Sequence, residues 1–473
     1  MPEFPNDPSE DRDRETFDIV GPGQTYESVT ERISGVVLTN RVSLRWLLAF
    51  GIALGLTGLL FAAITWTLLF GPGVWGVNVP VAWAFAIINF VWWIGFGHAG
   101  TFISAFLLLL HQNWRTAINR FAEAMTLFAV MQAGLFPVLH LGRHQYAYWL
   151  FPFPNSMGVW PQFRSPLMWD VFAVSTYFTV SLLFWYVGLI PDLATLRDRA
   201  QNPWVKIIYG IMAFGWRGSA LHWRRYSQLY LLLAGLATPL VVSVHTVVSY
   251  DFSFSIVKGW HSTIFPPYFV AGALFQGFAL VLILAVPLRS TGHLKALITM
   301  RHLENLGKMI LVTGWIVTYA YIIEIFMGWY SGNKYEYYTI FNNRMFGPYS
   351  PAFWLLLFCN CIAIQPLWFK KVRTNVAALF TIAVLVSIGM WIERFVIIVS
   401  SLARDYMPSY WAMYYPTWVD ISILIGTIGF FALLFMLFAR LLPSISIAEM
   451  RELVRHHGRR ASFTEASIGE GSG

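Results

Sequence analysis

The stretch that decides the fold and the candidate site is residues 134–170, GLFPVLHLGRHQYAYWLFPFPNSMGVWPQFRSPLMWD. It begins as the end of an apolar run that carries His140, continues as a loop rich in proline and aromatic residues, and ends at Trp169 and Asp170, where a second apolar run begins. When one loop joins two membrane-spanning runs, the end of the first run and the start of the second lie at the same membrane face. A titratable pair, His140 and Asp170, is therefore predicted at similar depth on one membrane face.

The composition is that of a membrane protein. Of the 473 residues, 57% are hydrophobic and only 12% are charged, whereas soluble domains carry about 25% charged residues. The acidic first residues lack the apolar segment of a signal peptide, so none is expected to be cleaved. Cys359 and Cys361 lie in an apolar run, at a spacing that matches no zinc, iron–sulfur or c-type haem motif, and are expected to be packed thiols.

Ten apolar runs are long enough to cross a bilayer, which takes about 20 residues. They cover residues 44–70, 80–110, 118–141, 167–190, 226–249, 263–287, 304–329, 351–369, 376–400 and 417–441. The tails, residues 1–43 and 442–473, are polar. The sequence therefore predicts an all-α polytopic membrane protein with about ten transmembrane helices and without a separate soluble domain.

The placement of lysine and arginine predicts the orientation. Most of the 32 such residues fall in the two tails and in the second, fourth, sixth and eighth connectors. The opposite face has only Arg143, Arg164, Lys258, Lys334, Arg344 and Arg404. Both termini are therefore expected in the cytoplasm, and residues 134–170 are expected to face outward, into the periplasm if the cell has one.

Two short patterns recur in the same order along the chain. RFAE at 120–123 and RHLE at 301–304 open the third and seventh runs, and SPLMW at 165–169 and SPAFW at 350–354 open the fourth and eighth. Two copies in the same orientation are typical of a parallel repeat. We therefore expect two parallel four-helix bundles.

The repeat also divides the chain into segments. The first bundle is predicted over residues 80–249 and the second over 250–400. The first and tenth helices are expected to be peripheral, in residues 44–79 and 401–441. The symmetry fails at Asp170, because Leu355 follows the second copy of the pattern, so the chemistry is predicted in the first bundle.

The residue types of His140 and Asp170 suit quinol chemistry. Oxidation of a quinol releases two electrons and two protons, and an imidazole and a carboxylate can accept those protons. We therefore interpret the pair as catalytic residues of a quinol site. The alternative is that Asp170 caps a helix N-terminus, where a carboxylate is favoured, and that His140 is an interfacial polar residue.

Four neighbours are predicted to complete the quinol site. His144 lies one turn beyond His140, Trp169 precedes Asp170, and Tyr146 opens the aromatic loop. Arg143 is included with them, although contact with a lipid or a partner protein is the favoured interpretation for it. The loop 146–166 can line a pocket for an aromatic headgroup, form an interfacial aromatic belt or provide a docking surface for another subunit.

Other ionisable residues fall inside the apolar runs, where such groups usually face a bundle interior. A proton path is predicted to use His98, Glu123, His245, Asp251, Glu304, Lys308, Glu324, Glu393 and Arg394. The alternative is a local Glu304–Lys308 pair, with the remainder serving as structural polar contacts. Because His98, His140 and His245 are not expected to share one depth, axial ligation of a haem is not expected.

Three sequence runs carry a resemblance to a known family. They are FGHAGT at 96–101, LFPVLHLGR at 135–143 and SPLMWD at 165–170. Together with the predicted topology, they make residues 40–445 resemble the NrfD/PsrC-type integral membrane subunits. Within that family, the chain most resembles the large quinol-binding membrane subunit of bacterial alternative complex III.

The resemblance implies a membrane subunit of a multi-subunit oxidoreductase in the bacterial cytoplasmic membrane. Its substrate would be menaquinol or another quinol, oxidised on the periplasmic side with accompanying proton translocation, and the chain itself would bind no metal or haem. Electrons would pass to an iron–sulfur subunit on the outer face, then to multihaem c-type cytochromes and a terminal oxidase. A second NrfD-like membrane subunit and lipids are further implied partners, and nucleic acid is not.

Three other functions are left open by the sequence. The same fold can serve as the quinone-reactive membrane anchor of a molybdopterin oxidoreductase of the polysulfide-reductase type. A secondary transporter also has parallel repeats and buried charges, although clear glycine or proline interruptions at matching positions are missing. A purely structural anchor leaves Asp170 unexplained.

Overall fold

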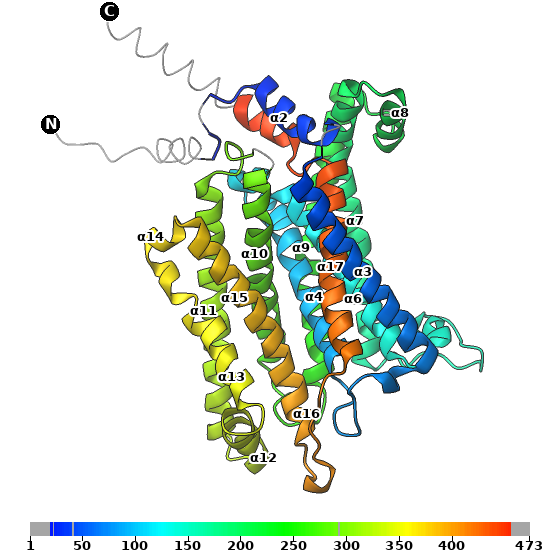
Figure 1. Cartoon of the computed structure of the whole chain (residues 1–473), viewed down its shortest axis with the longest axis vertical. Helices are drawn as coiled ribbons and strands as arrows, with labels where there is room; N and C mark the ends of the chain where they lie inside the picture. The colour runs from blue at the N-terminus through cyan, green and yellow to red at the C-terminus, as the bar shows by residue number, and fades with distance from the viewer. Residues whose placement is uncertain (1–18, 22, 40–41, 292–293, 456–473) are drawn as a thin grey trace, which may run out of the picture.

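A computed structural model describes residues 19–455 except residues 22, 40–41 and 292–293. These residues form long helices that run side by side (Figure 1), and none of them lies in a β-strand. Ten of the described helices are long and apolar enough to cross a membrane. They coincide with the ten predicted runs, so the prediction of an all-α polytopic membrane protein is confirmed.

The ten candidate spans are built from the following elements. They are α3 (Leu44–Phe70), α4 (Phe85–Thr101) continued by η2 (Phe102–Phe106) and α5 (Leu107–Leu109), α6 (Asn119–His140), α7 (Pro166–Arg199), α9 (Ala220–Ser253), α10 (Phe265–Thr291), α11 (Met300–Tyr330), α13 (Ser350–Leu357) continued by η6 (Phe358–Ile362), α15 (Val376–Phe395) continued by η8 (Val396–Ser400) and α16 (Ser401–Ala403), and α17 (Trp418–Leu441). The shorter connecting elements are α2 (Tyr26–Leu38), α8 (Pro203–Met212), α12 (Lys334–Tyr337) and α14 (Lys370–Arg373).

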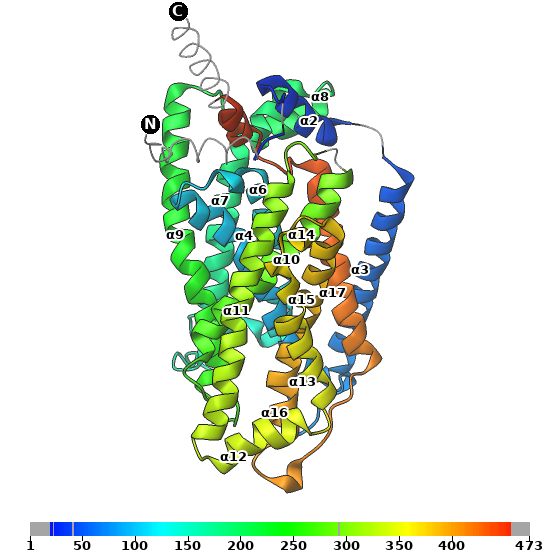
Figure 2. The same ribbon diagram turned by 90° about the vertical axis from the view of Figure 1, so that its left-hand side faces the viewer.

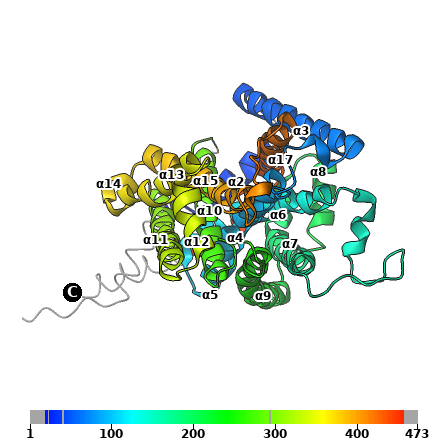
Figure 3. The ribbon, with the colours of Figure 1, turned by 90° about the horizontal axis from the view of Figure 1, so that it is seen from below.

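The helices pack in two neighbouring groups. In the first group, α4 packs along α6, α6 contacts α7, and α7 packs along α9. In the second group, α10 packs along α11 and α15, and α13 contacts α15. Helix α10 also packs against α4 and α9, and so joins the groups, while α3 and α17 pair at one side (Figures 2 and 3). Every residue of α4 is buried, so this helix forms the centre of the protein.

Close packing of α4 on α6 depends on Gly100. A Cβ atom at this position would lie 2.0 Å from the carbonyl oxygen of Ala122 and 2.3 Å from Oγ1 of Thr126. We expect Gly100→Ala to push the two helices apart and to lower the midpoint of thermal unfolding in detergent by several degrees. Gly235→Ala on α9 is the matched control, because open space surrounds Gly235. It should stabilise its helix slightly, and equal effects of the two substitutions would contradict this account.

The two tails are more ordered than a polar composition predicts, because parts of both form helices. Helix α2 buries Val29, Ile33 and Val37 on one face, and residues 447–455 are also helical. The two segments meet where the Arg451 guanidinium lies 4.5 Å from the Tyr26 ring centroid. We call this end of the molecule the inner end, and the opposite end the outer end, following the orientation predicted from the lysines and arginines.

The outer end consists of loops and short helices. The connection from α6 to α7 contains the 3₁₀ helix η4 (His144–Leu150) and extends sideways from the helices (Figures 1 and 3). The connection between α11 and α13 contains α12 and the π-helical η5 (Tyr338–Met345). The predicted site residues His140 and Asp170 lie at this end, at the end of α6 and the start of α7 respectively.

Candidate functional site

The structure pairs Asp170 with Asp251. Asp170 lies in the second turn of α7 and Asp251 in the last turn of α9, and these two helices pack against each other. The two carboxyl groups lie close enough to interact with each other, and one oxygen of each has no hydrogen-bond partner among the described residues. Asp170 is 7% exposed and Asp251 is half-buried, so the pair lies at the edge of the protein interior.

A pair of carboxyl groups has a defined chemistry. Two negative charges side by side repel each other, so neighbouring carboxyl groups are most stable when they share one proton. Such a pair can accept a proton from a bound hydroxyl group and release it elsewhere. The helix-capping alternative is not what the structure shows, because the N-cap of α7 is Ser165.

Aromatic side chains surround the aspartate pair. The ring centroid of Trp169 lies 6.2 Å from that of Tyr250 and 5.9 Å from that of Phe254, both edge-on. The Trp169 indole Nε1 donates a hydrogen bond of 2.7 Å to the carbonyl oxygen of Phe163. Trp169 therefore fixes the end of the aromatic loop against α9, beside the two carboxyl groups.

His140 contacts tryptophan side chains at the same end of the molecule. Its Nε2 atom is 3.3 Å from the carbonyl oxygen of Ala82, and its ring faces the indoles of Trp75 and Trp83 at 6.1 and 6.4 Å between centroids. The Trp83 ring in turn contacts Phe252 at 6.1 Å, the residue after Asp251. A tryptophan therefore lies between His140 and the end of α9 that carries Asp251.

The three remaining predicted site residues lie on the connection after α6. Arg143 and Tyr146 are exposed, and His144 is half-buried. The Tyr146 ring contacts Trp149 at 4.7 Å between centroids. The arrangement of Arg143 fits the prediction of a contact with a lipid or a partner at least as well as a place in the quinol site.

His98 and His245 form a second buried pair, deeper in the first group of helices. Their ring centroids are 4.5 Å apart in an edge-on arrangement, and both residues are 0% exposed. The expectation that these two histidines lie at different depths was therefore wrong. Helices α4 and α9 bring them into direct contact, which leaves no room for a haem between the two rings.

Tyr177 extends this polar group toward the inner end. Its ring stacks on His98 at 5.3 Å, and its hydroxyl group lies 3.0 Å from Oγ1 of Thr101. Oγ1 of Thr101 lies 3.3 Å from Oγ of Ser181. Tyr177 was not predicted as a site residue, because a tyrosine in an apolar run resembles an ordinary core residue. Only the packing of the helices shows that its hydroxyl group contacts other polar groups.

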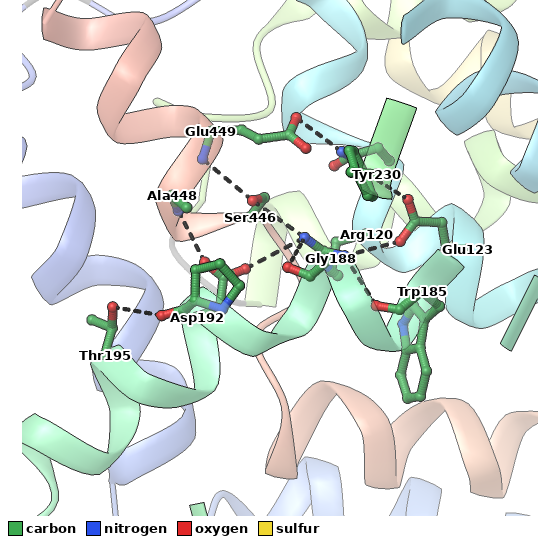
Figure 4. Close-up of polar contacts among 12 residues, drawn as sticks. Arg120, Glu123, Trp185, Gly188, Asp192, Thr195, Tyr230, Ser446, Ala448 and Glu449 are labelled. Carbon is green, nitrogen blue, oxygen red and sulfur yellow. Dashed lines mark hydrogen bonds and ion pairs between the residues drawn. The ribbon is translucent and has the colours of Figure 1, made fainter. Parts of the chain in front are cut away.

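A cluster of charged residues closes the inner end of the first group (Figure 4). The buried Arg120 guanidinium lies 3.0 Å from Oε2 of Glu123 and 3.6 Å from Oδ2 of Asp192, and it donates a 2.8 Å hydrogen bond to the Gly188 carbonyl. Glu123 also accepts hydrogen bonds from Ser104 and Tyr230. Of these charged residues, only Glu123 was predicted to be functional.

The C-terminal segment completes this cluster. The backbone N–H of Ala448 donates a 2.9 Å hydrogen bond to Oδ1 of Asp192 (Figure 4). The carboxylate of Glu449 lies 3.0 Å from the Arg115 guanidinium. Burial alone would lower the pKa of Arg115, but the negative charges around it, that of Glu449 first, raise it above its ordinary value. Residues 446–449 therefore cover the inner end of the first helix group.

The other predicted proton-path residues lie in the second group of helices. Glu304 and Lys308 form the local pair of the alternative interpretation, at 3.3 Å, and Arg373 joins them at 3.5 Å from Glu304. Of these three side chains only that of Lys308 is well exposed, at 44%, while Glu304 is buried. Glu324 pairs with Arg344, and Glu393 contacts Arg394, both toward the outer end. The structure therefore does not place all nine residues on one continuous route.

No three metal-ligating side chains among the described residues lie close enough together to hold a metal ion. Cys359 and Cys361 are free thiols.

Comparison with known proteins identifies the family. Residues 73–404 match the family model described as "Polysulphide reductase, NrfD". A putative membrane subunit of the dimethyl sulfoxide reductase of Halobacterium salinarum is 26% identical over 394 residues, which are 78% of this chain and 84% of that protein. A subunit of the selenate reductase of Mesobacillus selenatarsenatis is 22% identical over 402 residues, covering 80% of this chain and 89% of that protein. The chain therefore belongs to the NrfD family of polysulphide reductase.

Proposed function

We propose that this chain is the quinol-reactive membrane subunit of a multi-subunit reductase, and that it oxidises menaquinol or a similar quinol at its outer end. The observation that carries the proposal is the interacting pair Asp170–Asp251, with Trp169 next to Asp170. His140 is connected to this end of α9 through the rings of Trp83 and Phe252. A quinol hydroxyl needs a proton acceptor in a water-poor site. The Asp170–Asp251 pair provides two carboxyl groups at the outer end, one of them buried.

The chemistry assigns a task to each residue. The quinol loses two electrons and two protons and becomes a quinone. The ionised carboxyl group of the Asp170–Asp251 pair accepts one hydroxyl proton, and His140 is the second acceptor, on the other side of Trp83. Both protons leave to the outer aqueous phase, and the electrons pass to an iron–sulfur subunit.

The docking surface for that iron–sulfur subunit is the aromatic connection between α6 and α7. Its apolar side chains are unusually exposed for a loop: Tyr148, Phe151, Phe153, Met157, Val159, Trp160 and Phe163 are each 38–75% exposed. An exposed apolar surface of this kind is typical of a protein–protein contact. Trp169 connects this surface to the aspartate pair through its hydrogen bond to Phe163.

The names of the relatives favour a reductase anchor over a membrane component of alternative complex III. Both relatives are named as parts of reductases, one of dimethyl sulfoxide and the other of selenate. We therefore propose a molybdopterin-containing catalytic subunit and an iron–sulfur subunit as partners. Transfer of electrons to multihaem cytochromes and a terminal oxidase is the second candidate, supported by the sequence resemblance alone.

Isolation of the intact complex from its native membrane tests both candidates. We expect an iron–sulfur protein and a molybdopterin protein to copurify with this chain, and a reduced menaquinol analogue to be oxidised when the acceptor of the catalytic subunit is present. Copurifying multihaem cytochromes, identified by their optical spectrum, would favour the second candidate. Absence of quinol oxidation in the intact complex would refute the proposed function.

A further inference from the structure

The second group of helices contains a cavity of its own at the outer end, with polar residues on one part of a mostly apolar lining. Its lining includes Tyr268, Tyr321, Glu324, Arg344 and Glu393, and it is large enough to hold a water molecule. These residues come from α10, α11, η5 and α15. None of them lies within the quinol site proposed above, and this cavity has no role in the chemistry assigned so far.

The inner wall of the cavity is an acid–base group. Glu393 is 0% exposed, and its carboxylate accepts a hydrogen bond from the hydroxyl group of Tyr321. That hydroxyl group accepts a hydrogen bond of 2.8 Å from the side-chain amide of Asn360. An ionisable carboxyl group at this depth is expensive to maintain unless it is paired. Here a hydroxyl donor and the guanidinium of Arg394 pair with it.

A partly exposed ion pair lies at one side of the cavity. Nη1 of Arg344 lies 2.6 Å from Oε1 of Glu324, and the Glu324 side chain is 18% exposed. Arg344 also donates hydrogen bonds to the Gly259 carbonyl and to Ser401, at 3.3 and 3.4 Å. The fixed guanidinium opposes the binding of a metal cation, so the polar part of the lining is suited to water and protons.

The cavity also adjoins the buried groups of the first helix group. The Phe269 ring lies between the two sets: its centroid is 5.8 Å from that of His245 and 5.1 Å from Cζ of Arg394. The Nε and Nη2 atoms of Arg394 have no hydrogen-bond partner among the described residues. The charged group behind the cavity and the His98–His245 pair are therefore separated by a single aromatic ring.

We propose that Glu393 is an acid–base site that exchanges protons with the outer aqueous phase through this cavity, independently of the Asp170–Asp251 pair. The carboxylate takes up one proton from water in the cavity and returns one to it. Glu324 and Arg344 form the entrance, and Tyr321 holds the carboxylate in place. The proposal goes beyond the quinol site and holds whether or not the chain oxidises quinol.

Labelling with a membrane-impermeant, charged methanethiosulfonate tests water and proton access together, because only a thiolate reacts with such a reagent. The experiment uses the full chain in sealed membrane vesicles, with Cys359→Ala and Cys361→Ala as background. Glu393→Cys reports on the acid–base site itself. Ile397→Cys reports on a position one helical turn outward that also lines the cavity and keeps the carboxylate. Val386→Cys, at a 0% exposed position on the same helix, is the control.

We expect Glu393→Cys and Ile397→Cys to react from the outer side at least about tenfold faster than Val386→Cys. The rate should rise with the pH of the outer solution at constant inner pH, because the thiol then loses its proton to that side. Labelling only from the inner side, a rate that follows the inner pH, or equal rates in all three variants would overturn the proposal. If Glu393→Cys fails to fold, Ile397→Cys alone decides it. Quinol oxidation is measured separately, so failure of the quinol site leaves this result intact.

Discussion

Replacing Asp170 with asparagine should lower the rate of quinol oxidation at least about 100-fold, the lower limit for loss of a positioned acid–base group. Asparagine matches the shape of aspartate and can still hydrogen-bond to Asp251, so assembly of the protein should survive. The substitution removes one of the two ionisable carboxyl groups, so Asp170 and Asp251 can no longer share a proton. The measurement is the initial rate of oxidation of a reduced menaquinol analogue by the intact complex.

Asp251→Asn should have nearly the same effect, and the double substitution should be little worse than either single one. The reason is that two carboxyl groups that share a proton act as one unit, whose losses do not add. Asp198→Asn is the matched control, since it changes a carboxylate on the same helix α7 whose side chain is 64% exposed. If the rate reductions of the two single variants multiply in the double variant, the two aspartates act separately. Full activity of both single variants would show that neither takes part in the mechanism.

The sequence was sufficient for the helices because an apolar run of membrane length leaves the backbone few alternatives. Helix α7 shows the limit of that argument. The apolar run predicts its end near residue 190, but the helix continues to Arg199. Asp192 lies in the additional turns, where it forms an ion pair with Arg120 and accepts a hydrogen bond from the backbone N–H of Ala448. Polar residues can extend a helix when tertiary partners exist, and composition does not show those partners.

The candidate site was only half predictable for a similar reason. Asp170 and His140 stand out because charged and titratable residues are rare beside apolar runs. Whether Asp170 meets Asp251, and whether His98 contacts His245, depends on how α7, α9 and α4 are rotated about their axes. These helices have apolar residues on most of their surface, so their sequences define no single buried face. Helix α2 is the opposite case: Val29, Ile33 and Val37 recur at helical spacing and share one buried face, but the polar composition of the tail concealed the helix.

The largest effect on stability is expected from Arg120→Ala. Its guanidinium is fully buried and holds together Glu123, Asp192 and the Gly188 carbonyl (Figure 4). Removing it leaves two buried carboxylates without their cation, which costs about 3–5 kcal/mol for a broken buried ion pair. We expect loss of most of the assembled protein from the membrane, or a large drop in the thermal unfolding midpoint of what remains, measured by size-exclusion chromatography after heating in detergent.

Two further variants separate the lost charge from lost packing. Arg225→Ala removes an exposed arginine at the inner end and should leave the unfolding midpoint within about a degree, because surface substitutions away from special features change stability little. Adding Glu123→Gln and Asp192→Asn to Arg120→Ala removes the unpaired charges and should restore a large part of the stability. Replacing all members of a buried ion cluster by neutral residues is tolerated far better than removing only the cation. If the triple variant is as unstable as Arg120→Ala, the cluster acts by filling space, and the inner end is held by packing of the C-terminal segment instead of by its charges.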